Sequence, residues 1–127
     1  MNAAQHRDKA MRIERSLERL SDADFESVIE GAMLAGTHWF NLLLHRFQVF
    51  PESRDAMHAE FLTVGERRRI AAKMRDALDA LDTIEAFRTS HVRGDMAEGE
   101  ASARRVRDCL ARLRAAAESA GGEPQAR

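Results

Sequence analysis

The sequence predicts an all-α protein, an up-and-down four-helix bundle with a long loop or a short extra helix between its second and third helices. Composition is the first indication, because 32% of the residues are charged, only two are proline and none is tyrosine. The second is the recurrence of apolar residues at spacings of three and four along four segments. At 127 residues the chain makes one domain, which we place at 1–120, with a flexible tail over 121–127.

Two helices are predicted in the first half of the chain. The first carries an apolar stripe at Ala10, Ile13, Leu17 and Leu20. The second should begin near Asp22, since Ser21 and Asp24 have the spacing of a capping box, and Pro51 should end it. Its central stretch, 31–50, is apolar on almost every side, which predicts a helix surrounded by the others.

The second half predicts two more helices after a loop, or a short helix over 54–62. Thr63 and Glu66 have the spacing of another capping box, and an apolar stripe follows them. Gly94 is expected to end this third helix, and Asp95 with Glu98 to cap the fourth. The fourth stripe includes Ala97, Ala101, Val106, Cys109, Leu110, Leu113 and Ala117.

Charge and cysteine content exclude some classes of function. A formal net charge of −1 argues against a protein that binds bulk DNA or an anionic membrane surface. Glu30 and His45 are separated by only fourteen residues, short of the roughly 20 apolar residues that span a bilayer. The single cysteine, Cys109, cannot form an internal disulfide, so we expect a buried thiol and a cytoplasmic location.

A line of polar residues interrupts the apolar second helix. His38, Asn41 and His45 are spaced i, i+3, i+7 and therefore share one face. They can serve core hydrogen bonds, a ligand pocket or a metal site. The two histidines lie about 10 Å apart along the axis at 1.5 Å per residue, so this helix alone cannot hold an ion between them. We predict no metal and no cofactor, while a site built by His45, His58 and His91 from separate segments stays open.

The junction between the third and fourth helices carries a second polar group, in which Arg88, His91 and Arg93 can cap helix carbonyls or contact a ligand. No metalloprotease motif, nucleophile elbow or phosphate-binding glycine loop occurs, so we assign no catalytic residue and favour binding over catalysis. The candidate ligand-binding residues are His38, Asn41, His45, His58, Arg88, His91 and Arg93.

The long apolar second helix, the long third helix ending in Arg88 and His91, the tight turn and the fourth helix together resemble the HEPN superfamily of helical bundles. The resemblance covers roughly 22–118. Many nucleases of that family carry an Arg followed four to six residues later by a His. Here two residues separate Arg88 from His91 and three separate Arg54 from His58, so the nuclease spacing is missing. The chain also resembles small bacterial proteins of unassigned function that share the His-Trp-Phe-Asn helix core.

The resemblance implies a HEPN-like bundle that binds a nucleotide or another small ligand and forms a homodimer. We therefore expect a ligand-binding or protein-interaction module. The alternative is a divergent, metal-independent ribonuclease that uses Arg88 and His91.

Overall fold

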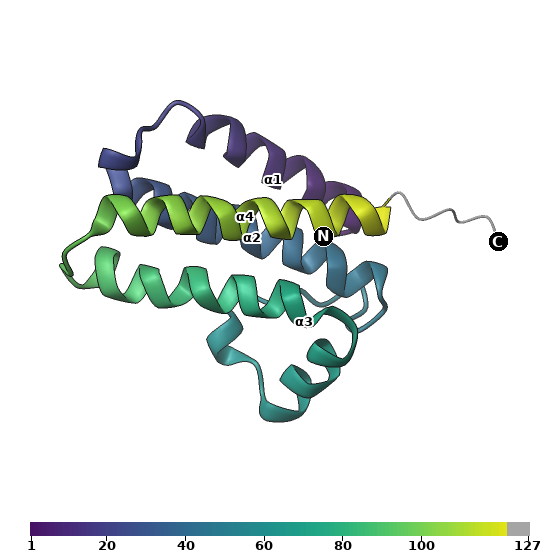
Figure 1. The fold of residues 1–127 in the computed structure, drawn as a ribbon. Helices are drawn as coiled ribbons and strands as arrows, with labels where there is room; N and C mark the ends of the chain where they lie inside the picture. The colour runs from purple at the N-terminus through teal and green to yellow at the C-terminus, as the bar shows by residue number, and fades with distance from the viewer. Residues whose placement is uncertain (122–127) are drawn as a thin grey trace.

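The structure, a computed structural model, describes residues 1–121 and confirms an all-α bundle (Figure 1). The four long helices are α1 (Ala3–Leu17), α2 (Phe25–Arg46), α3 (Val64–Phe87) and α4 (Gly99–Gly121). Three short elements join them: the 3-10 turns η1 (Asp22–Asp24) and η2 (Ala59–Phe61), and the π-helical turn η3 (Arg88–Arg93). Apart from Gly121, which belongs to α4, the predicted tail lies outside the described residues.

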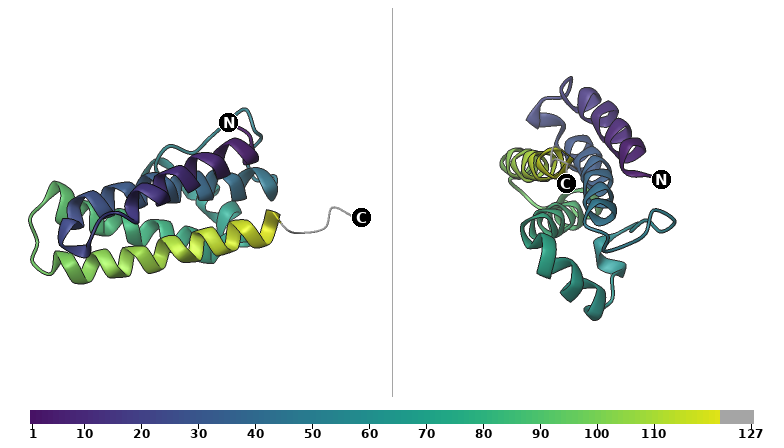
Figure 2. Two further views of the ribbon diagram at one scale, coloured as in Figure 1. Left: turned by 90° about the horizontal axis from the view of Figure 1, so that it is seen from above. Right: turned by 90° about the vertical axis from the view of Figure 1, so that its right-hand side faces the viewer.

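Helix α2 is the centre of the bundle, as its apolar sequence predicts. It packs against α1, α3 and α4, and Figure 2 shows it lying between α4 and the loop that leads to α3. Its large side chains Trp39, Phe40 and Leu44 are fully buried. In the part of the chain that the structure covers, no helix combines the length and apolar character needed to cross a bilayer.

The prediction that Pro51 ends the second helix is wrong, because α2 ends at Arg46. Gln48 adopts a left-handed backbone with φ of 58°, which turns the chain back on itself. The amide of Val49 then donates to the carbonyl of Leu44 at 2.9 Å, and Phe50 is buried. The chain therefore returns along α2 rather than leaving the bundle, and residues 50–58 lie against that helix.

The junction before α4 also differs from the prediction. The predicted capping box of Asp95 and Glu98 is not formed by any side-chain hydrogen bond among residues 1–121. Instead, α4 begins at Gly99, and Glu98 before it is left-handed with φ of 70° and accepts from the amide of Ser102 at 3.1 Å. The backbone of Gly94 passes so close to η3 that a Cβ atom there would lie 2.8 Å from the carbonyl oxygen of Ser90, which explains a glycine at this turn. The capping boxes predicted at Ser21 and Thr63 are both present.

Candidate functional site: a histidine and aspartate cluster beside a pocket

Asn41 fixes the loop that follows α2. Its side-chain amide donates to the carbonyl of Ala56 at 2.8 Å, and its side-chain oxygen accepts from the amide of Ala56 at 2.7 Å. The amide also donates to the carbonyl of Thr37. Both Asn41 and Ala56 are buried, so this pair of hydrogen bonds holds the loop at a defined height along α2. The neighbouring residue, Asp55, is thereby placed over the polar face of the helix.

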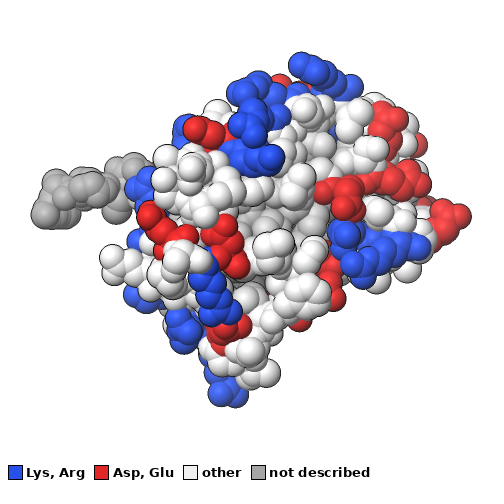
Figure 3. Space-filling view, turned by 180° about the vertical axis from the view of Figure 1, so that it is seen from behind, with Lys and Arg blue, Asp and Glu red and all other residues white. Residues whose placement is uncertain are grey.

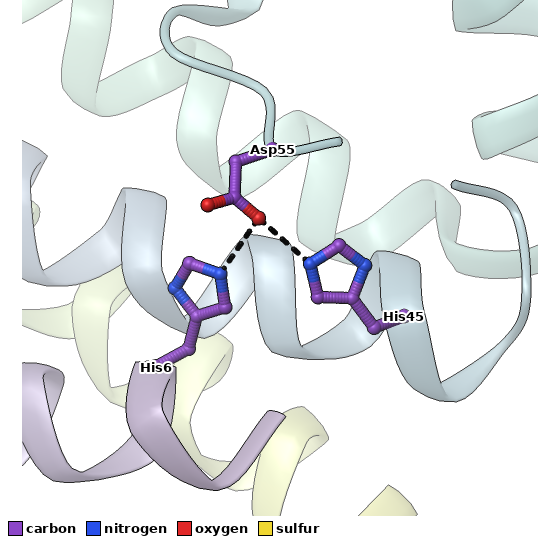
Figure 4. A group of neighbouring side chains, drawn as sticks. All are labelled: His6, His45 and Asp55. Carbon is purple, nitrogen blue, oxygen red and sulfur yellow. Dashed lines mark hydrogen bonds and ion pairs between the residues drawn. The ribbon is translucent and has the colours of Figure 1, made fainter. Parts of the chain in front are cut away.

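Two histidines from different helices meet the Asp55 carboxylate (Figure 4). The Nε2 atoms of His6 and His45 lie 2.9 and 2.8 Å from the same oxygen, Oδ1. Both imidazole side chains are almost completely buried, at 1% and 2% exposed. The other carboxylate oxygen, Oδ2, accepts a hydrogen bond from the amino group of Met1 at 3.2 Å.

The remaining ring nitrogens of the two histidines also have partners. Nδ1 of His6 lies 2.9 Å from Nδ1 of His38, and Nδ1 of His45 lies 3.1 Å from the carbonyl oxygen of Phe50. We call the group formed by His6, His45 and Asp55 the HHD cluster. His38 and the Phe50 carbonyl form its outer contacts.

Burial and hydrogen bonding set the protonation of this group. Burial alone would raise the pKa of Asp55, but hydrogen bonds from His6 and His45 outweigh it and lower the pKa to about 2. Burial lowers the pKa of His6, although the hydrogen bond to Asp55 opposes this effect. Burial and the neighbouring His6 lower the pKa of His38 to about 4. At neutral pH the carboxylate is therefore ionised and the His38 ring is uncharged.

A pocket of about 370 Å³ opens beside the cluster. Its apolar wall includes Met33, Leu34 and Met57, and four of the predicted ligand-binding residues line it together: His38, Asn41, His58 and Arg88. His6 and Asp55 also reach the pocket, whereas His45 is not among its lining residues. Figure 3 views the side of α2 turned away from α4, where an uncharged central area is flanked by acidic and basic side chains.

The structure separates the residues of the predicted third-to-fourth junction. Arg88 faces the pocket but is paired with Glu30 at 2.9 Å and with Glu85 at 3.4 Å. These acidic neighbours raise the pKa of Arg88, and the hydrogen bond that Arg88 donates to Glu30 contributes most. His91 is buried, does not line this pocket, and lies 3.0 Å from the carbonyl of Met96 through Nδ1. Arg93 is exposed.

A second group with ligand-like atoms contains His58, Glu60 and Glu85. Nδ1 of His58 and Oε1 of Glu85 are buried and have no hydrogen-bond partner within residues 1–121. Glu60 is exposed, and Glu85 already pairs with Arg88 through its other oxygen. In the HHD cluster, by contrast, all three side chains are in mutual contact, because both histidine Nε2 atoms lie within hydrogen-bond distance of Oδ1 of Asp55.

Cys109 is a buried free thiol, as predicted. Burial raises its pKa, so the thiolate is disfavoured and the side chain is a poor nucleophile.

The sequence prediction missed His6 and Asp55. A signal for His6 was present, because it lies four residues before Ala10 and so extends the apolar stripe of α1. Asp55 lies in the loop between the second and third predicted helices, but its place in the site depends on the left-handed turn at Gln48 and the hydrogen bonds from Asn41, which apolar spacing does not predict.

Comparison with known proteins gives no assignment: no family model, no curated protein and no solved structure matches the chain.

Proposed function

We propose that this protein binds a small molecule in the pocket between α2 and the 55–58 loop. The observation that carries the proposal is the convergence of His38, Asn41, His58 and Arg88 on one pocket, although they come from three separate segments. A volume of about 370 Å³ is within the size range of small-molecule sites.

The lining residues favour a compact, largely apolar ligand with one hydrogen-bonding group. Met33, Leu34 and Met57 provide flexible apolar contacts, and Leu34 and Met57 are 51% and 72% exposed. His38 is uncharged at neutral pH because its pKa is about 4, so it can exchange a hydrogen bond without adding charge. Arg88 is already paired with Glu30 and Glu85, which makes the phosphates of a nucleotide a poorer match.

A ligand screen by ¹H–¹⁵N NMR tests this proposal. A library of small apolar alcohols, amides and carboxylates should contain compounds that shift the resonances of Met33, Leu34 and Met57. Leu34→Trp should abolish these shifts, because the larger side chain fills an exposed part of the pocket wall. Met96→Trp is the matched control, since Met96 is also exposed but does not line this pocket. If no compound shifts these resonances, or if the shifts persist in Leu34→Trp, the proposal is wrong.

The HEPN-like assignment, the homodimer and the cytoplasmic location belong to the same proposal. A long apolar α2 beside a long α3, which ends at Phe87 and is followed by Arg88, supports the HEPN-like proposal. Exposed Met57, Phe61 and Val64 provide apolar surface for a second copy. Light scattering tests the dimer: a mass of two chains supports it, and a monomer at high concentration contradicts it. The single free thiol is compatible with a reducing compartment.

A further inference from the structure

We infer that the HHD cluster, formed by His6, His45 and Asp55, is a binding site for a divalent transition-metal ion of the zinc type. This inference is independent of the small-molecule proposal, because it depends on the cluster and its outer contacts and not on any molecule in the pocket. The donor atoms of the three residues all lie within 4.8 Å of one another. Two imidazoles and one carboxylate are a donor set that suits Zn²⁺ and related ions better than Mg²⁺ or Ca²⁺.

The distances are close to those of a coordination site. Donors about 2.1 Å from one ion lie about 3.0 Å apart at right angles and about 3.4 Å apart at the tetrahedral angle. The two Nε2 atoms lie 2.9 and 2.8 Å from Oδ1 of Asp55. An ion therefore requires these nitrogens to move away from the carboxylate oxygen by about 0.1–0.2 Å at right angles and by about 0.5–0.6 Å at the tetrahedral angle.

The outer contacts are the second, independent observation. Metal-binding histidines almost always donate their other ring N–H to a carbonyl, carboxylate or similar acceptor. Nδ1 of His45 faces the carbonyl oxygen of Phe50 at 3.1 Å, an acceptor for the hydrogen of Nδ1. In the tautomer that makes this hydrogen bond, the lone pair of Nε2 faces the negative oxygen of Asp55, where an ion can bind.

Two lone-pair atoms facing one another are unfavourable, and an ion bound between Nε2 and Oδ1 relieves the conflict. Both atoms then share one cation, and the imidazole ring stays neutral in a side chain that is 2% exposed.

His6 fits the same description. Its Nε2 faces Asp55 and its Nδ1 faces Nδ1 of His38, so a hydrogen on His6 Nδ1 that is donated to His38 leaves Nε2 free for the ion. Any hydrogen on either Nε2 atom leaves to solvent when the ion binds, because metal-binding imidazole nitrogens must be deprotonated.

The three residues leave coordination positions open to small ligands, and His6 and Asp55 border the 370 Å³ pocket. Sites with three protein donors and an open position are typical of metals that bind water or a substrate. The HHD cluster therefore places an ion where a molecule in the pocket can reach it.

Calorimetric titration of the metal-free full chain with Zn²⁺ tests the inference. We expect one Zn²⁺ per chain and no heat from Mg²⁺. Asp55→Asn keeps the shape and hydrogen-bond acceptance of the side chain but weakens Zn²⁺ binding by more than about 100-fold, since even outer contacts of metal sites contribute 10–100-fold. His91→Gln is the matched control, because it replaces a buried histidine outside the cluster and the pocket. His58→Gln tests whether the ion binds instead at the second donor group.

The inference is overturned if the wild-type chain binds no Zn²⁺, if Asp55→Asn binds it normally, or if His58→Gln abolishes binding and so places the ion among His58, Glu60 and Glu85. X-ray absorption of the Zn²⁺-loaded wild-type chain provides a readout that needs no variant. Two imidazole ligands and oxygen donors support the HHD cluster, and any other number of imidazoles contradicts it.

Discussion

The HHD cluster and the η3 turn both place histidines near charged side chains, yet they differ in what surrounds the imidazole rings. In the cluster, the Nε2 atoms of two buried rings meet one carboxylate oxygen. In η3, His91 lies between the rings of Phe25 and Phe87, with centroids 6.1 and 6.0 Å away, and bonds to the local carbonyl of Met96. The first arrangement brings three potential metal-ligand atoms together, and the second provides a hydrogen-bond partner for a backbone carbonyl after the helix end.

The comparison shows that sequence distance separates the two kinds of histidine. His6 and His45 reach Asp55 across 49 and 10 residues, whereas His91 bonds five residues away. A contact to a carbonyl five residues away, which His91 makes to Met96 and Nδ1 of His45 makes to Phe50, satisfies the local backbone. A contact that joins α1, α2 and a loop depends on the whole fold, and its geometry is therefore the better indication of a site.

Loss of the hydrogen bonds between Asn41 and the backbone of Ala56 should produce the largest change in stability and in Zn²⁺ binding. Asn41→Leu leaves the buried amide and carbonyl of Ala56 without partners, which costs about 1–3 kcal/mol of unfolding free energy. It also releases Asp55 from its position, so Zn²⁺ binding should weaken with stability. Urea denaturation and Zn²⁺ titration measure the two effects. A variant as stable as the wild type would contradict the role of Asn41 in fixing this loop.

Removal of the contact between His6 and His38 should have a smaller effect, which is limited to the affinity for Zn²⁺. His38→Phe takes away the partner of His6 Nδ1 while keeping a planar ring of similar size. We expect Zn²⁺ to bind about 10–100-fold more weakly with unchanged stoichiometry. Calorimetry provides both values, and an unchanged affinity would show that His38 does not orient His6.

The η3 histidine should behave in the opposite way. His91→Gln loses a hydrogen bond to Met96 and ring contacts, so unfolding should become easier by about 1 kcal/mol. Zn²⁺ affinity should equal that of the wild type, because His91 does not belong to the cluster. A large loss of affinity with retained folding would break the distinction between the two regions.

The ion pair between Glu30 and Arg88 at the pocket rim should contribute least to the free energy of unfolding. Glu30 is 53% exposed where it meets Arg88, and pairs with an exposed partner contribute roughly 0–1 kcal/mol. Glu30→Gln should therefore change stability by less than about 1 kcal/mol, with the difference shrinking in high salt. Thermal unfolding at two salt concentrations measures it. A larger, salt-independent loss would mean that this pair is part of the core.

Most of the fold was predictable because it depends on local patterns. Apolar spacing located the four helices, the capping boxes at Ser21 and Thr63 marked helix starts, and the apolar sequence of α2 predicted its central position. The helix boundaries at Arg46 and Gly99 were missed, because each depends on a left-handed non-glycine residue, Gln48 or Glu98, for which sequence offers no strong signal.

The site was only partly predictable. His38, Asn41 and His45 do share a face, and the expectation that α2 alone cannot hold an ion is consistent with the partners the structure brings to it from other segments. Asn41, however, is occupied by the backbone of Ala56 rather than open to a ligand. The position of Asp55 follows from a returning loop and long-range packing, which spacing rules do not describe.

The hydrogens on the imidazole rings provide the most direct measurement of the central claim. Long-range ¹H–¹⁵N NMR assigns the protonated nitrogen of each ring. After one equivalent of Zn²⁺ is added to the metal-free chain, the rings of His6 and His45 should carry hydrogen on Nδ1 alone, with both Nε2 signals shifted by the ion, while the His91 signals stay unchanged. Spectra of His6 and His45 that do not respond to Zn²⁺ would contradict the account and leave the cluster a structural hydrogen-bond network.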